Sequence, residues 1–109
     1  EVLLANGGST LFWDAAAFGL VERRSAHLVI GEFSAKFAQV TAAAPHLEDP
    51  VVVECEPGSV PARLGPTGGV DAHAFPHNET STGVTVPIHR PDGDALVLVD
   101  ATSAAGGMR

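Results

Sequence analysis

The sequence predicts an α/β fold with a mostly parallel β-sheet. Continuous apolar runs such as "HLVI" and "ALVLV" are typical of strands that are buried on both faces. In the first half of the chain these runs alternate with segments whose apolar residues recur at helical spacing, and this order of strand and helix favours a parallel sheet. We expect the sheet to be covered on both faces.

Composition limits the class of protein. The chain has 109 residues, the length of one small domain, and 45% of them are hydrophobic. Its net charge is −7, and its six Lys and Arg residues form no cluster larger than Arg23–Arg24, so we expect no nucleic-acid partner. No apolar run approaches the roughly 18 residues of a membrane span. The single Cys55 cannot form an internal disulfide, which fits a reducing compartment.

The first half of the chain predicts alternating strands and helices. The turn Asn6-Gly7-Gly8 ends the first apolar run, and Ser9 or Thr10 is expected to cap the helix that follows. Pro45 ends the second helix. We expect a strand at 2–5, a helix over 11–21, a strand at 27–30, a helix over 32–44 and a strand at 51–55.

The second half is less regular. Residues 56–70 contain three Pro and four Gly and predict a flexible surface connection, and "RPDGD" predicts a turn. His73 and His77 are four residues apart, but in a strand and loop rather than a helix, so we expect no metal site. No repeat and no separate second domain is indicated. Strands are expected at 71–75, 84–89 and 95–100.

Polar groups follow three apolar strands, at the positions where open α/β sheets bind ligands. In "NGGST", Gly7 and Gly8 let the backbone approach an anion, Ser9 and Thr10 add hydroxyls, and the N–H groups of the next helix point the same way. Neither a Walker A motif nor a complete G-x-G-x-x-G is present, so a nucleotide P-loop is not indicated. An ordinary capped turn explains the motif equally well.

The other two polar groups are a loop and a single carboxylate. The loop 78–82 offers an amide and three hydroxyls, although such residues also form ordinary turns. Asp100 directly follows "ALVLV", where it either pairs with a cation on a ligand or caps its own loop through Thr102 or Ser103. An anion cradle, a hydroxyl-bearing loop and a strand-end aspartate together match pyridoxal phosphate (PLP), whose ring nitrogen works best when an aspartate keeps it protonated.

Four blocks of the sequence resemble the phosphoserine aminotransferase family, in its actinobacterial branch. These blocks are "NGGSTLFWDAAAFGL", "GEFSAKFA", "HNETSTGV" and "VLVDATSAAGG", and only residues 56–70 fall outside the resemblance. The resemblance implies that residues 1–109 are an internal part of the large, PLP-binding domain of a fold-type I transferase, which is the aspartate aminotransferase-like fold, in class V. The chain begins at Glu1 without a basic start, which agrees with this expectation.

The family's activity is implied in the same way. Its members are cytoplasmic homodimers that convert 3-phosphohydroxypyruvate and glutamate to phosphoserine and 2-oxoglutarate in serine biosynthesis, and some also serve pyridoxine biosynthesis. The resemblance implies that Ser9 and Thr10 hold the cofactor phosphate, that Thr80 contacts the cofactor and that Asp100 binds its ring nitrogen. Two further candidates for cofactor contact are Gly8 and Asn78.

The resemblance places Phe33 where an aromatic side chain stacks on the pyridine ring. From helical spacing alone, Phe33 is instead a core residue that shares a face with Phe37. The family's catalytic lysine lies downstream of the last block, and Lys36 does not correspond to it, so no catalytic residue is expected in this chain and no activity of the chain alone. The alternatives are a part of another class V PLP enzyme, of the alanine–glyoxylate aminotransferase or cysteine desulfurase type, or a non-catalytic phosphate-binding α/β module.

Overall fold

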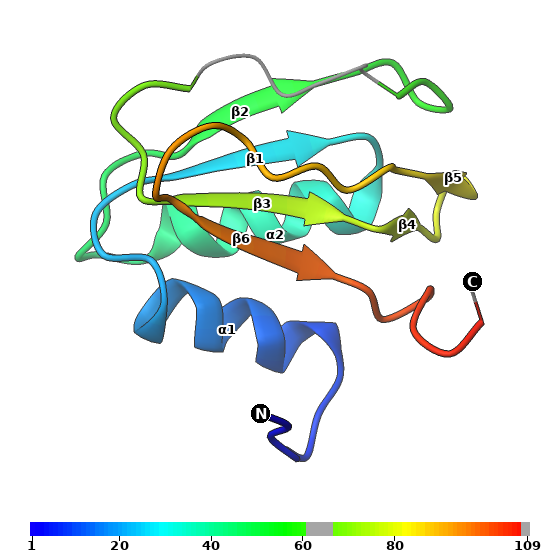
Figure 1. Ribbon diagram of the computed structural model, residues 1–109, viewed down its shortest axis with the longest axis horizontal. Coiled ribbons are helices and arrows are strands. Elements are labelled where there is room, and N and C mark those ends of the chain that lie inside the picture. The colour runs from blue at the N-terminus through cyan, green and yellow to red at the C-terminus, as the bar shows by residue number, and fades with distance from the viewer. Residues whose placement is uncertain (61–66, 108–109) are drawn as a thin grey trace.

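The computed structural model describes residues 1–60 and 67–107. Figure 1 shows a sheet of long strands accompanied by two helices, with a small hairpin at the carboxyl end of the sheet. The helices are α1 (Ser9–Gly19) and α2 (Glu32–Ala43). The strands are β1 (Ser25–Val29), β2 (Val51–Glu54), β3 (Ala72–Pro76), β4 (Asn78–Glu79), β5 (Val84–Thr85) and β6 (Leu96–Asp100).

The main sheet has four strands in the order β2-β1-β3-β6, and every neighbouring pair is parallel. This confirms the predicted α/β class with a parallel sheet. The chain leaves β1 to form β2 on one side and later returns to form β3 on the other side of β1. The topological switch point therefore lies between β1 and β3, which is where sheets of this kind bind ligands.

Both helices pack on the same face of the sheet. Trp13 of α1 and Phe37 of α2 stack with their ring centroids 6.1 Å apart, over small or apolar side chains of β3 and β6. The opposite face carries a second apolar cluster that is closed by Val86, in the segment that follows β5. The sheet is thus covered on both faces, as expected, but by helices on one face and by an extended segment on the other.

Two predicted features near the N-terminus are wrong. Residues 2–5 form no strand: the side chains of residues 2–4 are at least 85% exposed, and no described strand pairs with them. An apolar run becomes a strand only where a neighbour accepts its backbone hydrogen bonds. The cap of α1 also differs, because Gly8 is the N-cap, Ser9 is already helical and no side chain caps the helix.

The region after β3 is also reorganised. The expected strand at 84–89 is reduced to β5, which pairs in antiparallel fashion with β4, with Asn78 opposite Thr85 and Glu79 opposite Val84. The polar loop is therefore the tip of a tight hairpin. Of the expected connection at 56–70, the described residues are irregular and residues 61–66 lie outside the described part of the chain.

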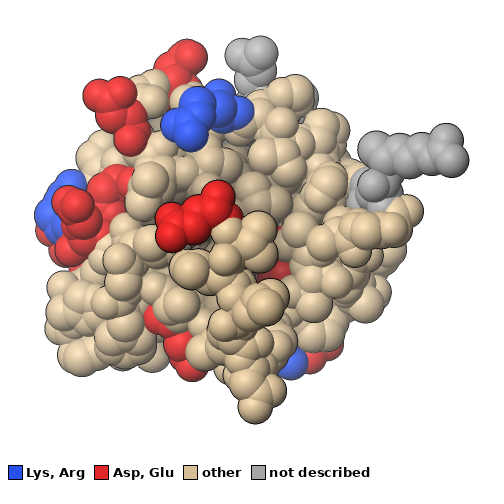
Figure 2. All heavy atoms as spheres, turned by 60° about the horizontal axis from the view of Figure 1, so that its bottom comes forward, with Lys and Arg blue, Asp and Glu red and all other residues tan. Residues whose placement is uncertain are grey.

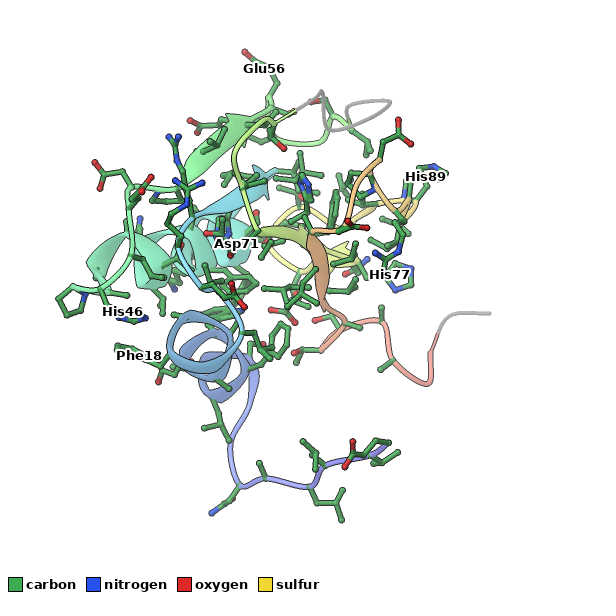
Figure 3. All side chains as sticks on the ribbon, turned by 60° about the vertical axis from the view of Figure 1, so that its left-hand side comes forward. Phe18, His46, Glu56, Asp71, His77 and His89 are labelled. Atoms are coloured by element: carbon green, nitrogen blue, oxygen red, sulfur yellow. The ribbon has the colours of Figure 1, made fainter. Side chains whose placement is uncertain are left out.

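The outward side of α1 is largely uncharged. Figure 2 shows that side of the molecule with scattered acidic groups and few basic ones. Phe18 of α1 is exposed and lies beside His46, with the ring centroids 5.2 Å apart (Figure 3). In residues 1–60 and 67–107, no helix combines the length and the apolar character that crossing a membrane requires.

Candidate functional site

A pocket of about 240 Å³ opens near the carboxyl ends of β1, β3 and β6, beside the switch point of the sheet. Its walls come from the first residues of α1, the first turns of α2, the β4 hairpin and the segment after β6. Five of the predicted site residues line this pocket: Ser9, Phe33, Asn78, Thr80 and Asp100. The other two, Gly8 and Thr10, are not among its lining residues.

Asp100 ends β6, and its carboxylate is fixed from two sides. The Trp13 Nε1–H group donates a 2.8 Å hydrogen bond to Oδ2, and Thr102 donates its backbone N–H and its hydroxyl to Oδ1 at 3.1 and 2.8 Å. The loop cap through Thr102 is therefore present, while the carboxylate still lines the pocket. Since each carboxylate oxygen has two lone pairs, Oδ2 keeps an acceptor site for a ligand.

Hydroxyl groups join the segments around the pocket. Ser9 Oγ donates to Thr102 Oγ1 at 2.8 Å, and the hydroxyls of Thr80 and Ser103 are hydrogen bonded to each other. These bonds connect the segment after β6 to the start of α1 and to the hairpin. Thr102 and Ser103 thus belong to the site, although the sequence indicated them only as caps for Asp100.

The start of α1 depends on a glycine. Gly7 has a φ of +151°, and a Cβ atom there would lie 2.8 Å from Leu11 Cβ, so a side chain is excluded by both backbone and space. The first N–H groups of α1 have no partner within the helix and carry the positive end of its dipole. This end of the pocket therefore favours an anionic group.

Phe33 forms an aromatic wall of the pocket and is not a core residue. Its exposed fraction is 38%, whereas that of Phe37, one turn further along α2, is 2%. The core interpretation from helical spacing is wrong for Phe33, because Phe37 packs in the apolar cluster on the helical face of the sheet whereas Phe33 lines the pocket outside that cluster. Lys36 Nζ lies 5.4 Å from the centre of the Phe33 ring.

Glu79 is a buried carboxylate that the sequence did not reveal as part of the site. Its exposed fraction is 0%, and it accepts hydrogen bonds from the backbone N–H groups of Phe33 and Ser34 and from the hydroxyls of Ser34 and Ser81. Burial raises the pKa of Glu79, but these hydrogen bonds, led by those from Ser34, outweigh it and hold the pKa below its usual value. The donors on Phe33 and Ser34 are more than 40 residues away along the chain, so no local pattern signals them.

His27 is a second polar residue that sequence reasoning missed. It lines the pocket from β1, is 1% exposed, and its Nε2 lies 2.9 Å from Ser25 Oγ and 3.0 Å from Thr41 Oγ1. Thr41 Oγ1 also donates to Ala38 O at 2.9 Å, so His27, Ser25 and Thr41 form one buried hydrogen-bond network. Burial lowers the pKa of His27 to about 4, which keeps the ring neutral.

The described residues contain no group of three His, Cys, Asp or Glu side chains placed to hold a metal ion. His73 is buried in β3 and His77 is half-buried between β3 and β4. The polar chemistry of the pocket therefore consists of one strand-end carboxylate, several hydroxyls, an amide, a neutral imidazole and a helix N-terminus.

Comparison with known proteins places this fold and site in a class. No family model matches the chain. Among solved structures, a phosphoserine aminotransferase from Cytophaga hutchinsonii has a TM-score of 0.79 and 30% identity over 91% of this chain and 29% of its own. An alanine–glyoxylate aminotransferase from Nostoc sp. has the same fold, with a TM-score of 0.78 and 22% identity over 96% of this chain and 30% of its own.

The fold and the position of the pocket define part of a fold-type I aminotransferase domain. In sequence, the chain is 60% identical over 110 residues to a protein named phosphoserine aminotransferase in Mycolicibacterium vanbaalenii. That match includes 99% of this chain and 29% of the relative, so the chain spans less than a third of the length of that relative. The chain is therefore similar to one section of proteins named phosphoserine aminotransferase.

Proposed function

We propose that this chain is the section of a phosphoserine aminotransferase that holds PLP in the enzyme's large domain. The observation that carries the proposal is Asp100. It is a carboxylate at the carboxyl end of a parallel strand, held by Trp13 and Thr102, and it lines a pocket whose other wall is the aromatic Phe33. The relation to phosphoserine aminotransferases supports the choice of reaction, the conversion of 3-phosphohydroxypyruvate and glutamate to phosphoserine and 2-oxoglutarate.

The residues that line the pocket fit the chemical groups of PLP. The N-terminus of α1, with Ser9, would hold the phosphate, and Thr10 and Gly8 would contribute through their backbone N–H groups. Phe33 would stack on the ring, and Asp100 would bind the protonated ring nitrogen. Thr80 and Asn78 would supply hydrogen bonds from the hairpin. When bound, PLP supplies an electron sink that stabilises negative charge on a substrate carbon.

The remaining machinery would lie in other parts of the enzyme. Lys36, the only lysine of the chain, is exposed and paired with Glu32 at 2.6 Å, so it is not placed to attack a carbonyl group in the pocket. We therefore infer that the catalytic lysine and the substrate-binding arginines come from sequence outside this chain, and that the chain alone is inactive. A cytoplasmic homodimer that serves serine biosynthesis, and in some relatives pyridoxine biosynthesis, completes this proposal.

The test uses the complete enzyme, its Asp100→Ala variant and a control, Asp92→Ala, in an exposed turn. PLP binding is followed by absorbance, and transamination is measured with glutamate and 3-phosphohydroxypyruvate. We expect Asp100→Ala to lower turnover by at least about 100-fold, with a much smaller effect on stability, and Asp92→Ala to change neither.

Three results would contradict the proposal. Full turnover in Asp100→Ala would remove the assigned role of that carboxylate. Preference for alanine and glyoxylate as substrates would favour the other class V aminotransferase. Binding of inorganic phosphate without any binding of PLP would favour the phosphate-binding module.

A further inference from the structure

We propose that Glu79 is the positioning residue for the aromatic wall of the pocket, which it sets by binding the first turn of α2. This inference rests on the proposed function, because the wall is assigned there to the PLP ring. Glu79 itself is fully buried and does not line the pocket. It acts through its neighbours, so its role is to place Phe33.

The hydrogen bonds of Glu79 converge on the N-terminus of α2. Oε1 accepts from the Phe33 N–H at 3.1 Å and from the Ser81 hydroxyl at 2.7 Å. Oε2 accepts from the Ser34 N–H at 2.9 Å and from the Ser34 hydroxyl at 2.6 Å. With the Ser81 N–H, which lies 3.4 Å from Oε1, five donors and the positive end of the helix dipole surround the carboxylate, and each of them favours its charged form.

The same side chain connects two walls of the pocket. Glu79 lies between Asn78 and Thr80 in the sequence, and both of these residues line the pocket. One carboxylate oxygen binds the backbone N–H of Phe33 itself. Glu79 therefore links the aromatic wall to the hairpin, together with the Ser81 hydroxyl, which accepts a hydrogen bond from the Glu32 N–H at 3.0 Å.

The backbone is shaped to receive this carboxylate. A Cβ atom at Gly31 would lie 2.5 Å from Glu79 Cγ and 2.5 Å from Ser81 Oγ, so the glycine at the N-cap of α2 leaves the space that Glu79 occupies. The Ser34 hydroxyl contacts the same carboxylate and accepts from the Ile30 N–H at 3.0 Å, which ties the end of β1 to the arrangement.

Neither close relative of glutamate can replace this group. In a glutamine, an NH₂ group replaces one of the two carboxylate oxygens. This NH₂ group cannot accept the hydrogen bond that the Phe33 N–H or the Ser34 N–H donates at that position. An aspartate is one methylene shorter and cannot reach both N–H groups from the hairpin. Binding both N–H groups therefore requires a side chain with the charge and the length of glutamate.

The experiment is a double-mutant cycle in the complete enzyme, read out as the dissociation constant of PLP and as the circular dichroism band of bound PLP in the visible range. The variants are Glu79→Gln, Phe33→Ala and their combination. The control is Glu32→Gln, which removes an exposed carboxylate from the first turn of the same helix. This control separates the loss of a charge at the helix end from the loss of the Glu79 contacts.

We expect Glu79→Gln to weaken PLP binding about ten-fold and to reduce the dichroism band, because hydrogen bonds to a charged group are lost. In the Phe33→Ala background, the same substitution should weaken binding by less than about two-fold, because a residue that acts through Phe33 has nothing left to position. Glu32→Gln should bind PLP as the parent enzyme does.

Other outcomes overturn the inference in distinguishable ways. An unchanged PLP affinity in Glu79→Gln, or a full ten-fold loss that persists in the Phe33→Ala background, removes the positioning role and leaves the proposed function intact. Failure of the parent enzyme to bind PLP removes both. If Glu79→Gln does not fold, Ser81→Ala takes its place in the cycle, with an expected loss of about three-fold that again disappears without Phe33.

Discussion

Trp13 Nε1 donates a 2.8 Å hydrogen bond to Asp100 Oδ2, across 87 residues of sequence. This bond joins the apolar core under α1 to the one carboxylate that lines the described pocket. Trp13 is only 5% exposed and stacks on Phe37, so the indole can rotate little. The packing of the core therefore holds Oδ2 of Asp100 in place, while Thr102 holds Oδ1.

Trp13→Phe tests this relationship. Phenylalanine keeps much of the apolar contact but has no N–H group, so Asp100 loses the donor at Oδ2. We expect a loss of stability of about 1–2 kcal/mol and PLP binding that is several-fold weaker. The measurements are urea unfolding of the complete enzyme and a PLP titration. Phe18→Leu, an exposed aromatic on the same helix, is the control and should leave PLP binding unchanged.

Asp71 is expected to matter for stability alone. Its carboxylate accepts from the backbone N–H groups of three consecutive residues, Glu22, Arg23 and Arg24, at 2.8 to 3.0 Å, and so holds the start of β3 against the turn that precedes β1 (Figure 3). Asp71→Asn should lower stability by about 1–3 kcal/mol with no change in the affinity for PLP. A weakened PLP affinity at unchanged stability would contradict this assignment.

The space at Gly31 gives a prediction with a matched glycine control. Gly31→Ala would place a methyl group 2.5 Å from both Glu79 Cγ and Ser81 Oγ, and relief of this overlap should cost about 1–3 kcal/mol. Gly19→Ala, at the end of α1, meets no atom within 4 Å and should be neutral or slightly stabilising. The measurement is thermal unfolding of both variants. Equal unfolding temperatures would show that Glu79 and Ser81 can move away from the added methyl group without a loss of stability.

Acid should destabilise the protein through His27. The pKa of His27 is about 4 when folded and 6.5 in the unfolded chain, so between these values only the unfolded state binds the proton. Stability is complete above pH 6.5 and falls as the pH decreases toward 4, by about 2 kcal/mol at pH 5. The Glu79 carboxylate adds a further loss only below pH 4.5, because its folded pKa lies under that value.

Urea unfolding at pH 7.5 and pH 5 measures this effect. His27→Gln keeps an N–H donor near the position of Nε2 but cannot titrate, so its stability should depend less on pH than that of the parent. The exposed His89→Gln is the control and should retain the full pH dependence. An identical pH dependence in His27→Gln would exclude His27 as the source.

The sequence predicted the parts of the fold whose signals are local. Helical spacing and Pro45 gave α2 almost to the residue, and continuous apolar runs gave the parallel strands. The apolar run at residues 2–5 was misleading, because a strand also needs a partner. The residues of the strand ends were predicted to meet, and Ser9, Thr80 and Asp100 do line one pocket.

The contacts that fix those residues could not be predicted in the same way. Trp13 and Asp100, or Glu79 and Ser34, are partners only because the sheet brings distant segments together. The buried role of Glu79 has no signature in "HNET", where it looks like one more polar residue of a turn. The sequence gives the residue types but not which distant segments come into contact, and these contacts determine the partners.

The N-termini of α1 and α2, which both lie at the pocket, differ in how their backbone N–H groups are hydrogen bonded. The first N–H groups of α2 are bound by Glu79, whereas α1 begins at Gly8 with no side-chain cap. A negative charge that enters the pocket is thus attracted toward α1 and gains nothing from α2. The positive potential at the pocket is therefore stronger on the α1 side, which favours the orientation of an elongated ligand whose anionic end points toward α1.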